Sequence, residues 1–231
     1  MAAERVVFVH GSGKFGAAAW PVQHRLAGRY DCLFVKRHGF DAAAAPEPTD
    51  FDADTRIVLQ NLNGRPGHVV AASQGAISAM MAAVARPDLV KSLSLFEPAC
   101  LSLTADLPAT MQHRALVGPL FERRQSMSDT EFLHEFVRLV FSAEAQAPQT
   151  EDAQRSAARL RMQRPPWEAP LDIVPGVPTL VVTGAWEPLY EEVAGYLEGT
   201  GARHLHAGGD HRPQDTGTGH QALEEFLAGH N

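Results

Sequence analysis

A serine stands between an apolar run and a helix-forming run in this sequence. Residues 68–72 are mostly apolar and precede Ser73, and residues 75–85 form a helical pattern. Ala71 and Gly75, two positions before and two after the serine, are both small. A nucleophile elbow needs this pattern, because its strained turn brings a strand and a helix close together. Ser73 is therefore a candidate nucleophile, and the alternative is a serine in an ordinary strand-to-helix turn that caps the helix.

A glycine-rich turn follows the first apolar run of the chain. Residues 5–9 are apolar and β-branched, and the sequence His-Gly-Ser-Gly follows at residues 10–13. Acyl transfer needs two backbone N–H groups aimed at the oxygen that becomes negatively charged. We expect one from Gln74, the residue after the serine, and the other from Ser12 in the glycine-rich turn.

The same turn also matches a motif of a different class of protein. Residues 11–16 fit Gly-x-Gly-x-x-Gly after a strand, where dinucleotide-binding proteins hold a pyrophosphate. The next apolar run, residues 31–35, ends without the acid that would hold a ribose, although Lys36 and Arg37 could suit the 2′-phosphate of NADP. The motif is weak by itself, and we expect no cofactor.

The order of these motifs resembles the α/β-hydrolase superfamily. The resemblance rests on the His-Gly-Ser-Gly turn followed by Trp20, the elbow at residues 71–75, Glu97 and Pro98 after the fourth apolar run, and a late histidine segment. It implies a serine hydrolase with its catalytic residues in the order serine, acid, histidine. Epoxide hydrolases and haloalkane dehalogenases of this fold use aspartate at the elbow. Ser73 instead favours an acyl-enzyme formed from an ester, thioester, lactone or activated amide.

The resemblance also implies a base and an acid. His211 follows the sixth apolar run and precedes the last helix, so it is the expected base, while His220 lies at or inside that helix. Glu187 after the fifth run is the expected acid, and Glu97 is the alternative. Residues 204–211 loosely match a zinc-hydrolase motif, but their spacing is too long, so we expect no metal.

Strand-like runs alternate with helical patterns along most of the chain. The runs are residues 5–9, 31–35, 68–72, 90–96, 179–183 and 203–207, and the first helical pattern is residues 17–26. This alternation predicts an α/β fold with a doubly wound, mostly parallel sheet of about six strands. The resemblance adds that this is an α/β-hydrolase fold whose leading strands are trimmed.

Residues 101–174 contain no strand-like run. We expect them to form a helical insert within a single domain spanning residues 1–231, with a capping box at Ser128 and a second helix over residues 150–161. Such an insert would form a cap that shapes the substrate pocket. The candidate substrate-binding residues are Met111, His113, Phe132 and Trp167 from the insert and Trp186 from the acid loop.

Composition limits the partners of the chain. Its 231 residues carry a formal charge of −7, and the pI is about 5.9, which argues against nucleic acid or an anionic membrane as a partner. Two cysteines exclude a disulfide scaffold, and neither a spanning segment nor a secretory signal is evident. We expect a cytoplasmic enzyme that acts on a small apolar acyl or aromatic substrate, with a homodimer as the candidate assembly.

Two further classes of function share this scaffold. A lyase, a cyclase or a carbon–carbon bond hydrolase would reuse the serine and histidine as an acid/base pair. A ligand-binding protein would keep the fold without turnover. The apparently complete set of serine, acid and histidine favours an ester or thioester hydrolase over both.

Overall fold

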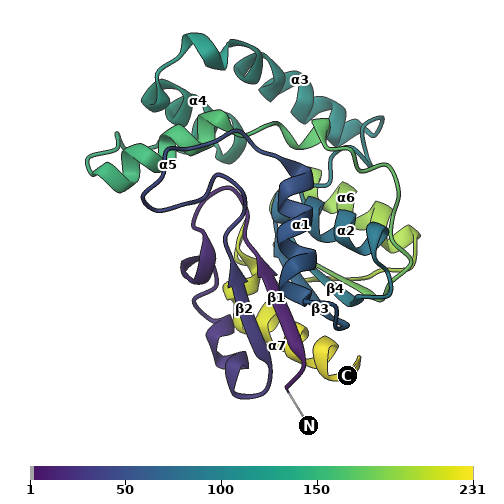
Figure 1. Ribbon diagram of the computed structural model, residues 1–231. Helices are drawn as coiled ribbons and strands as arrows, with labels where there is room; N and C mark the ends of the chain where they lie inside the picture. Colours follow the sequence, from purple (N-terminus) through teal and green to yellow (C-terminus); the bar gives the residue numbers. More distant parts are fainter. Residues whose placement is uncertain (1–2, 231) are drawn as a thin grey trace.

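The computed structural model describes residues 3–230, which form one parallel β-sheet with helices around it. Its strands are β1 (Arg5–Val9), β2 (Asp31–Val35), β3 (Gly67–Ala72), β4 (Val90–Phe96), β5 (Thr179–Thr183) and β6 (Arg203–His206). Their order across the sheet is β2-β1-β3-β4-β5-β6, and each neighbouring pair is parallel. The expected α/β fold with a six-stranded parallel sheet is thereby confirmed (Figure 1).

Helices cover both faces of this sheet. One face carries α1 (Phe51–Leu62), α2 (Gly75–Ala85) and α6 (Pro188–Gly199), and the other carries α7 (Gly217–Ala228) with two short 3₁₀ segments. Every residue of β3 and β5 is buried as a result. Uninterrupted apolar runs suit these strands, because neither of their faces meets water.

The segment after β1 differs from the sequence prediction. Instead of one helix over residues 17–26, the chain forms two 3₁₀ segments, Gly16–Ala19 and Gln23–Gly28. Pro21 lies between them, and because proline has no backbone N–H, it cannot donate the hydrogen bond that a continuous helix needs. Trp20 is fully buried against β1, so tertiary packing rather than a helical ladder fixes this segment.

The carboxyl ends of β1 and β3 lie side by side where the chain reverses its direction across the sheet. From β1 the chain moves outward to β2, whereas β3 to β6 follow on the other side. Val9 is in register with Ala71, so the turns after the two strands begin next to each other. Doubly wound proteins bind ligands in the crevice at such a point. The topology therefore brings Ser12 and Ser73 together at the carboxyl end of the sheet.

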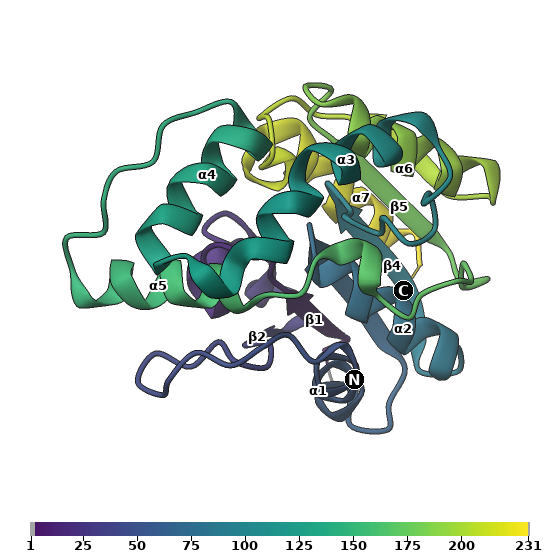
Figure 2. The same cartoon turned by 90° about the horizontal axis from the view of Figure 1, so that it is seen from above.

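Three helices from residues 101–174 lie above the carboxyl end of the sheet, as Figures 1 and 2 show. They are α3 (Pro108–Arg123), α4 (Asp129–Phe141) and α5 (Glu151–Met162). The predicted capping box starts α4: Ser128 Oγ accepts from the Glu131 N–H, and the Glu131 carboxylate accepts from the Ser128 N–H. α4 and α5 correspond to the two helices predicted from the sequence, whereas α3, which has Pro119 in its interior, was not predicted. We refer to residues 101–174 as the helical insert.

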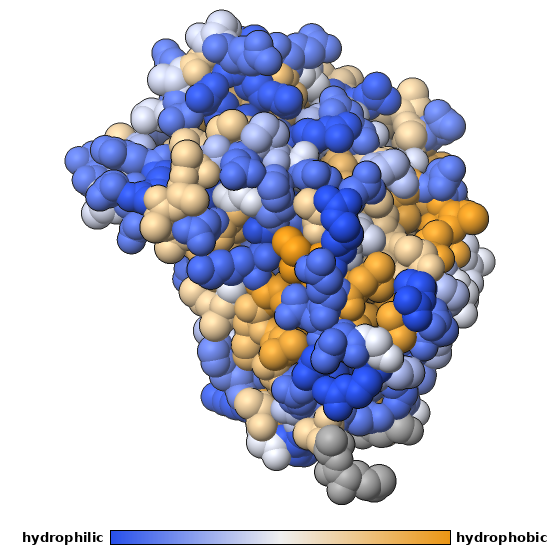
Figure 3. Space-filling view, viewed as in Figure 1, coloured by the Kyte–Doolittle hydropathy of each residue, from blue (hydrophilic) through white to orange (hydrophobic). Residues whose placement is uncertain are grey.

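The outer surface differs between the insert and the sheet domain. Figure 3 shows mostly hydrophilic side chains over the insert, while hydrophobic ones gather on the side that carries α1 and α2. None of the helices within residues 3–230 has the length and apolar character needed to cross a bilayer.

Candidate active site

Ser73 occupies a strained turn between β3 and α2. Its φ is +51°, in the left-handed region that few residues other than glycine adopt. The Ser73 N–H donates to the Phe96 carbonyl at 2.9 Å, which ties the turn to the end of β4. Gly75 touches the backbone of the turn after β1, where a Cβ would clash with the His10 carbonyl oxygen. Strain, small neighbours and a strand-to-helix junction are the requirements of a nucleophile elbow.

The turn after β1 touches the serine. A Cβ on Gly11 would lie 2.9 Å from Ser73 Cβ and 3.6 Å from Ser73 Oγ, so the approach requires glycine. Among the hydrogen bonds of residues 3–230, none uses the backbone N–H of Ser12 or of Gln74. Ser12, Ser73 and Gln74 line one cavity. Two backbone donors without an internal acceptor therefore accompany the serine.

His10 and Arg37 fix the orientation of the peptide between Gly11 and Ser12. Burial, with the nearby Arg37 charge, lowers the pKa of His10 to about 3, so its ring is neutral. His10 Nε2 accepts from the Arg37 N–H at 3.0 Å, and Nδ1 donates to the Gly11 carbonyl at 2.8 Å. The C=O and N–H of a trans peptide point in opposite directions. Holding the Gly11 oxygen therefore also sets the direction of the Ser12 N–H.

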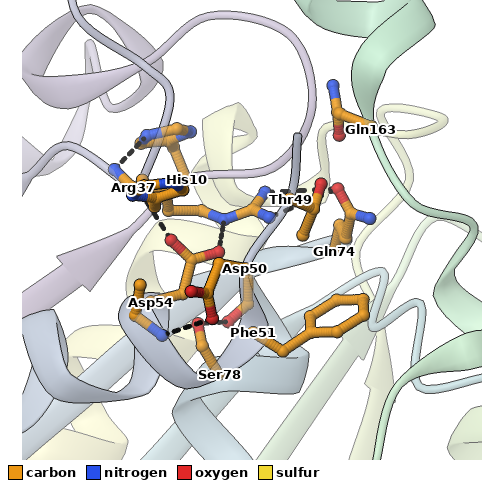
Figure 4. Close-up of polar contacts among 12 residues, drawn as sticks. His10, Arg37, Thr49, Asp50, Phe51, Asp54, Gln74, Ser78 and Gln163 are labelled. Carbon is orange, nitrogen blue, oxygen red and sulfur yellow. Dashed lines mark hydrogen bonds and ion pairs between the residues drawn. The ribbon is translucent and has the colours of Figure 1, made fainter. Parts of the chain in front are cut away.

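A buried ion pair supports the same turn. Arg37 Nε donates to Asp54 Oδ2 at 2.8 Å, and both side chains are only 1% exposed. The Gln74 amide oxygen accepts from Arg37 at 3.3 Å and from the Ser12 hydroxyl at 3.2 Å. Figure 4 shows Arg37 between His10, Asp54 and Gln74. The Gln74 amide oxygen thereby links this ion pair to Ser12, the other residue expected to supply an oxyanion N–H group.

These contacts remove the structural basis of the dinucleotide alternative. Arg37, one of the two cations that suited a 2′-phosphate, is buried against Asp54. The glycine-rich turn leads into a four-residue 3₁₀ segment, Gly16–Ala19, in place of the helix whose N-terminus would hold a pyrophosphate. The close approach to Ser73 accounts for Gly11 instead.

His211 contacts Glu97, not the Glu187 that the sequence analysis favoured. His211 Nδ1 lies 3.3 Å from Glu97 Oε2. The buried Glu97 carboxylate also accepts from the Gly184 N–H at 2.6 Å and from Trp186 Nε1–H at 3.0 Å. Among the contacts of residues 3–230, none joins His211 to Glu187. The structure thus assembles the histidine with the alternative acid.

The ends of β4 and β5 explain this difference. Glu97 follows β4 directly with φ +48°, so it is held at the strand end in a left-handed conformation, as Ser73 is after β3. Glu187 lies four positions beyond the end of β5, where it is the N-cap residue of α6. Gly184 packs against the Asp210 backbone so closely that a Cβ would clash there. The sequence signal for the acid was Glu97 itself, placed directly after an apolar strand.

Aromatic rings surround His211. The ring centroids of Tyr190, Phe141 and Trp186 lie 4.9, 5.5 and 6.1 Å from the imidazole centroid. Burial raises the pKa of Tyr190 far above its usual value, and the charges of Glu97 and Glu187 add to this, so its phenol is neutral. These rings limit the access of water to the histidine and its acid.

A cavity lies between Ser73 and the helical insert. Its volume is about 60 Å³, which is room for a few water molecules or one small apolar group. The insert lines it with two pairs of apolar side chains, Val117 with Phe121 on α3 and Phe136 with Val140 on α4. Each pair is spaced by four residues, so each presents one face of its helix. This spacing is the sequence signal that could have identified them.

The predicted substrate-binding residues occupy different environments. His113 and Trp167 line the cavity, and burial lowers the pKa of His113 to about 4, so its ring is neutral. Met111 lies outside it and is 56% exposed in a separate surface groove, because two positions along a helix turn a side chain to another face. Phe132 is fully buried within the insert, and Trp186 holds the acid. Met111, Phe132 and Trp186 therefore do not line this cavity, contrary to the expectation.

The chain is similar to known proteins along its whole length. Residues 6–227 match the sequence model of the alpha/beta hydrolase family. The protein therefore belongs to the alpha/beta hydrolase family, as the resemblance indicated. None of the curated proteins matches it significantly.

Solved structures share the fold at low sequence identity. NosK from Streptomyces actuosus is 23% identical, with 99% of each chain covered and a TM-score of 0.65. An alpha/beta hydrolase from Sphaerobacter thermophilus is 18% identical, with 97% of this chain and 93% of that chain covered and a TM-score of 0.63. An epoxide hydrolase from Bacillus megaterium, solved with an inhibitor, is 16% identical, with 98% and 94% covered and a TM-score of 0.67. At these identities the likeness concerns the fold alone.

Proposed function

We propose that the protein is a serine hydrolase that cleaves a small carboxylic ester or thioester through Ser73, His211 and Glu97. The observation that carries this proposal is Ser73 held at φ +51° at the carboxyl end of the sheet, the same end at which His211 meets the buried Glu97 carboxylate. This is the set of groups that acyl transfer requires. Glu97 takes the role that the sequence analysis gave to Glu187.

The reaction proceeds in two halves. Ser73 Oγ attacks the carbonyl carbon of the substrate while His211 Nε2 takes the hydroxyl proton, and Glu97 at Nδ1 stabilises the imidazolium. The Ser12 and Gln74 N–H groups donate to the oxyanion of the tetrahedral intermediate. Collapse expels the alcohol or thiol, which receives the proton from His211, and leaves an acyl group on the serine. Water, deprotonated by His211, then attacks the acyl-enzyme and releases the acid.

The cavity supports a small apolar acyl or aromatic group as substrate. Its lining is mostly aliphatic and aromatic, and its histidine, His113, is neutral near pH 7. The fold is shared with an epoxide hydrolase. That chemistry uses a carboxylate at the elbow in this superfamily, whereas this chain has Ser73, which favours acyl transfer.

Covalent labelling tests the nucleophile. A fluorophosphonate probe should modify the wild-type protein and the control variant Ser126→Ala, whose serine lies on the surface of the insert, and should not modify Ser73→Ala. Hydrolysis of p-nitrophenyl acetate and of an acetyl thioester should fall by about 10³-fold or more in Ser73→Ala. Labelling of Ser73→Ala at wild-type speed, or turnover that survives the substitution, would overturn the proposal.

A further inference from the structure

Two histidines and a glutamate lie close together at the outermost strand of the sheet, β6, outside the site described above. His204 and His206 are two positions apart on β6, so both project from the same face of the strand. Glu191 belongs to α6. His206 Nε2 lies 2.7 Å from Glu191 Oε2, and His204 Nε2 lies 3.8 Å from the same oxygen. One ligand atom from each residue lies within 4.8 Å of the others.

This donor set has the composition and size of a zinc site. A tetrahedral Zn²⁺ ion with bonds of about 2.0–2.2 Å holds neighbouring donor atoms about 3.3–3.5 Å apart. The two observed separations from the glutamate oxygen, 2.7 and 3.8 Å, lie on either side of that spacing. Imidazole nitrogen favours Zn²⁺ over Mg²⁺ and Ca²⁺, which prefer oxygen. Small side-chain rotations therefore suffice to form three bonds, and the fourth position remains for water.

The second oxygen of Glu191 points to a cation independently. Glu191 Oε1 is buried, and among the described residues it has no hydrogen-bond partner. A buried carboxylate oxygen without a partner is costly. A protonated His206 would satisfy only Oε2, whereas a metal ion can be bound through either or both oxygens of a carboxylate.

We propose that Glu191, His204 and His206 form a Zn²⁺ site that joins the edge strand β6 to α6. The ion displaces the hydrogen bond between Thr183 Oγ1 and His204 Nε2, which are 2.8 Å apart. The set shares two histidines with the loose zinc-hydrolase motif of the sequence but leaves out His211, which meets Glu97 instead. The proposed site differs from the sequence expectation that the protein holds no metal.

The position of this site indicates a structural role. Glu191 follows Tyr190, whose ring contacts His211, and β6 leads into the loop that carries His211. A bound ion would therefore fix two elements that flank the active-site histidine. It touches none of the reacting groups, so the hydrolase reaction does not require it.

Zinc titration of the full chain tests this proposal. Tag-free protein is stripped with a chelator, freed of the chelator and titrated with ZnCl₂ in a calorimeter at pH 7.5, with thermal unfolding followed in parallel. We expect one Zn²⁺ per chain and a higher Tm with zinc. His206→Ala and Glu191→Gln should each weaken binding at least about tenfold and abolish the Tm shift.

Two controls distinguish the loss of this zinc site from zinc binding at other histidines and from unfolding of the variant. His134→Ala removes an exposed histidine of α4 and should bind zinc as the wild type does. Fluorophosphonate labelling of Ser73 should be unchanged in His206→Ala, which shows that this variant is folded. Absence of saturable zinc binding, or wild-type affinity in His206→Ala and Glu191→Gln, would overturn the proposal and leave the cluster as an ion pair. Loss of zinc binding only in His211→Ala would also overturn it.

Discussion

The Glu97 carboxylate receives hydrogen bonds from three residues on two different loops of the chain. Gly184 and Trp186 donate from the loop after β5, and His211 approaches from the loop after β6. A buried carboxylate held in this way stays oriented, and an oriented carboxylate can fix the tautomer of the histidine. At the scale of single residues, this convergence identifies Glu97 as the acid of the proposed mechanism.

Amide substitutions distinguish the two glutamates. Glu97→Gln should lower kcat by about 10³–10⁴-fold, because the amide no longer stabilises the imidazolium. Glu187→Gln, the matched control, should change kcat only a few-fold. Steady-state hydrolysis of p-nitrophenyl acetate measures both, and the reverse ranking would return the role to Glu187.

The ion pair between Arg37 and Asp54 makes a second residue-scale prediction. Asp54→Ala leaves the Arg37 guanidinium buried without its partner, which should destabilise the protein by about 3–5 kcal/mol. Asp88→Ala breaks the exposed pair with Arg86 and should change stability little. Urea unfolding of both variants gives the comparison. Equal midpoints would show that the buried pair does not support the turn at Gly11.

The insert helices determine the pocket at the scale of elements. α3 and α4 each place an apolar pair into the cavity beside Ser73. The insert also contacts the turn after β1 and the start of α2 directly, since Gln163 Nε2 donates to the Ser12 carbonyl and Gln74 Nε2 donates to the Arg164 carbonyl. Both the shape of the pocket and the position of the turn therefore depend on how the insert packs.

Shortening a lining residue of α4 should change substrate preference. Val140→Ala removes two methyl groups from the cavity wall, so kcat/KM for p-nitrophenyl butyrate or hexanoate should rise relative to acetate by several-fold. Val137→Ala, on the same helix but outside the cavity, is the control. An unchanged ratio in Val140→Ala would show that acyl groups bind elsewhere.

Buried histidines couple the stability of the whole molecule to pH. Burial lowers the pKa of His10 to about 3 and that of His113 to about 4, below the value of about 6.5 for the unfolded chain. Between these values the unfolded chain binds more protons than the folded one. The free energy of unfolding should therefore fall as pH decreases from about 6.5 toward 4, by up to about 1.4 kcal/mol per pH unit for each histidine.

Removing one of these histidines tests the linkage. His113→Gln keeps a polar side chain of similar size but cannot titrate, so its stability should fall less steeply with decreasing pH. Urea midpoints at pH 7, 6 and 5 measure the slope before most carboxylates titrate. Parallel slopes for the variant and the wild type would contradict the prediction.

Local sequence determined the framework of this protein. The six strands, the elbow at Ser73 and the capping box at Ser128 depend on neighbours within a few positions, so composition and spacing were sufficient to predict them. The histidine loop followed from its place after the last strand. Residues 17–26 were predicted incorrectly because burial of Trp20 beside Pro21 overrode local helix-forming preference.

Only the tertiary structure decided which of these groups meet. Glu97 and Glu187 both follow apolar strands, and the choice between them depends on where the loop at Gly184 packs against the His211 loop. The pairing of Arg37 with Asp54 is likewise a contact between segments that are distant in the sequence. Sequence spacing specifies which face of an element a residue occupies, whereas packing between elements specifies what that face touches.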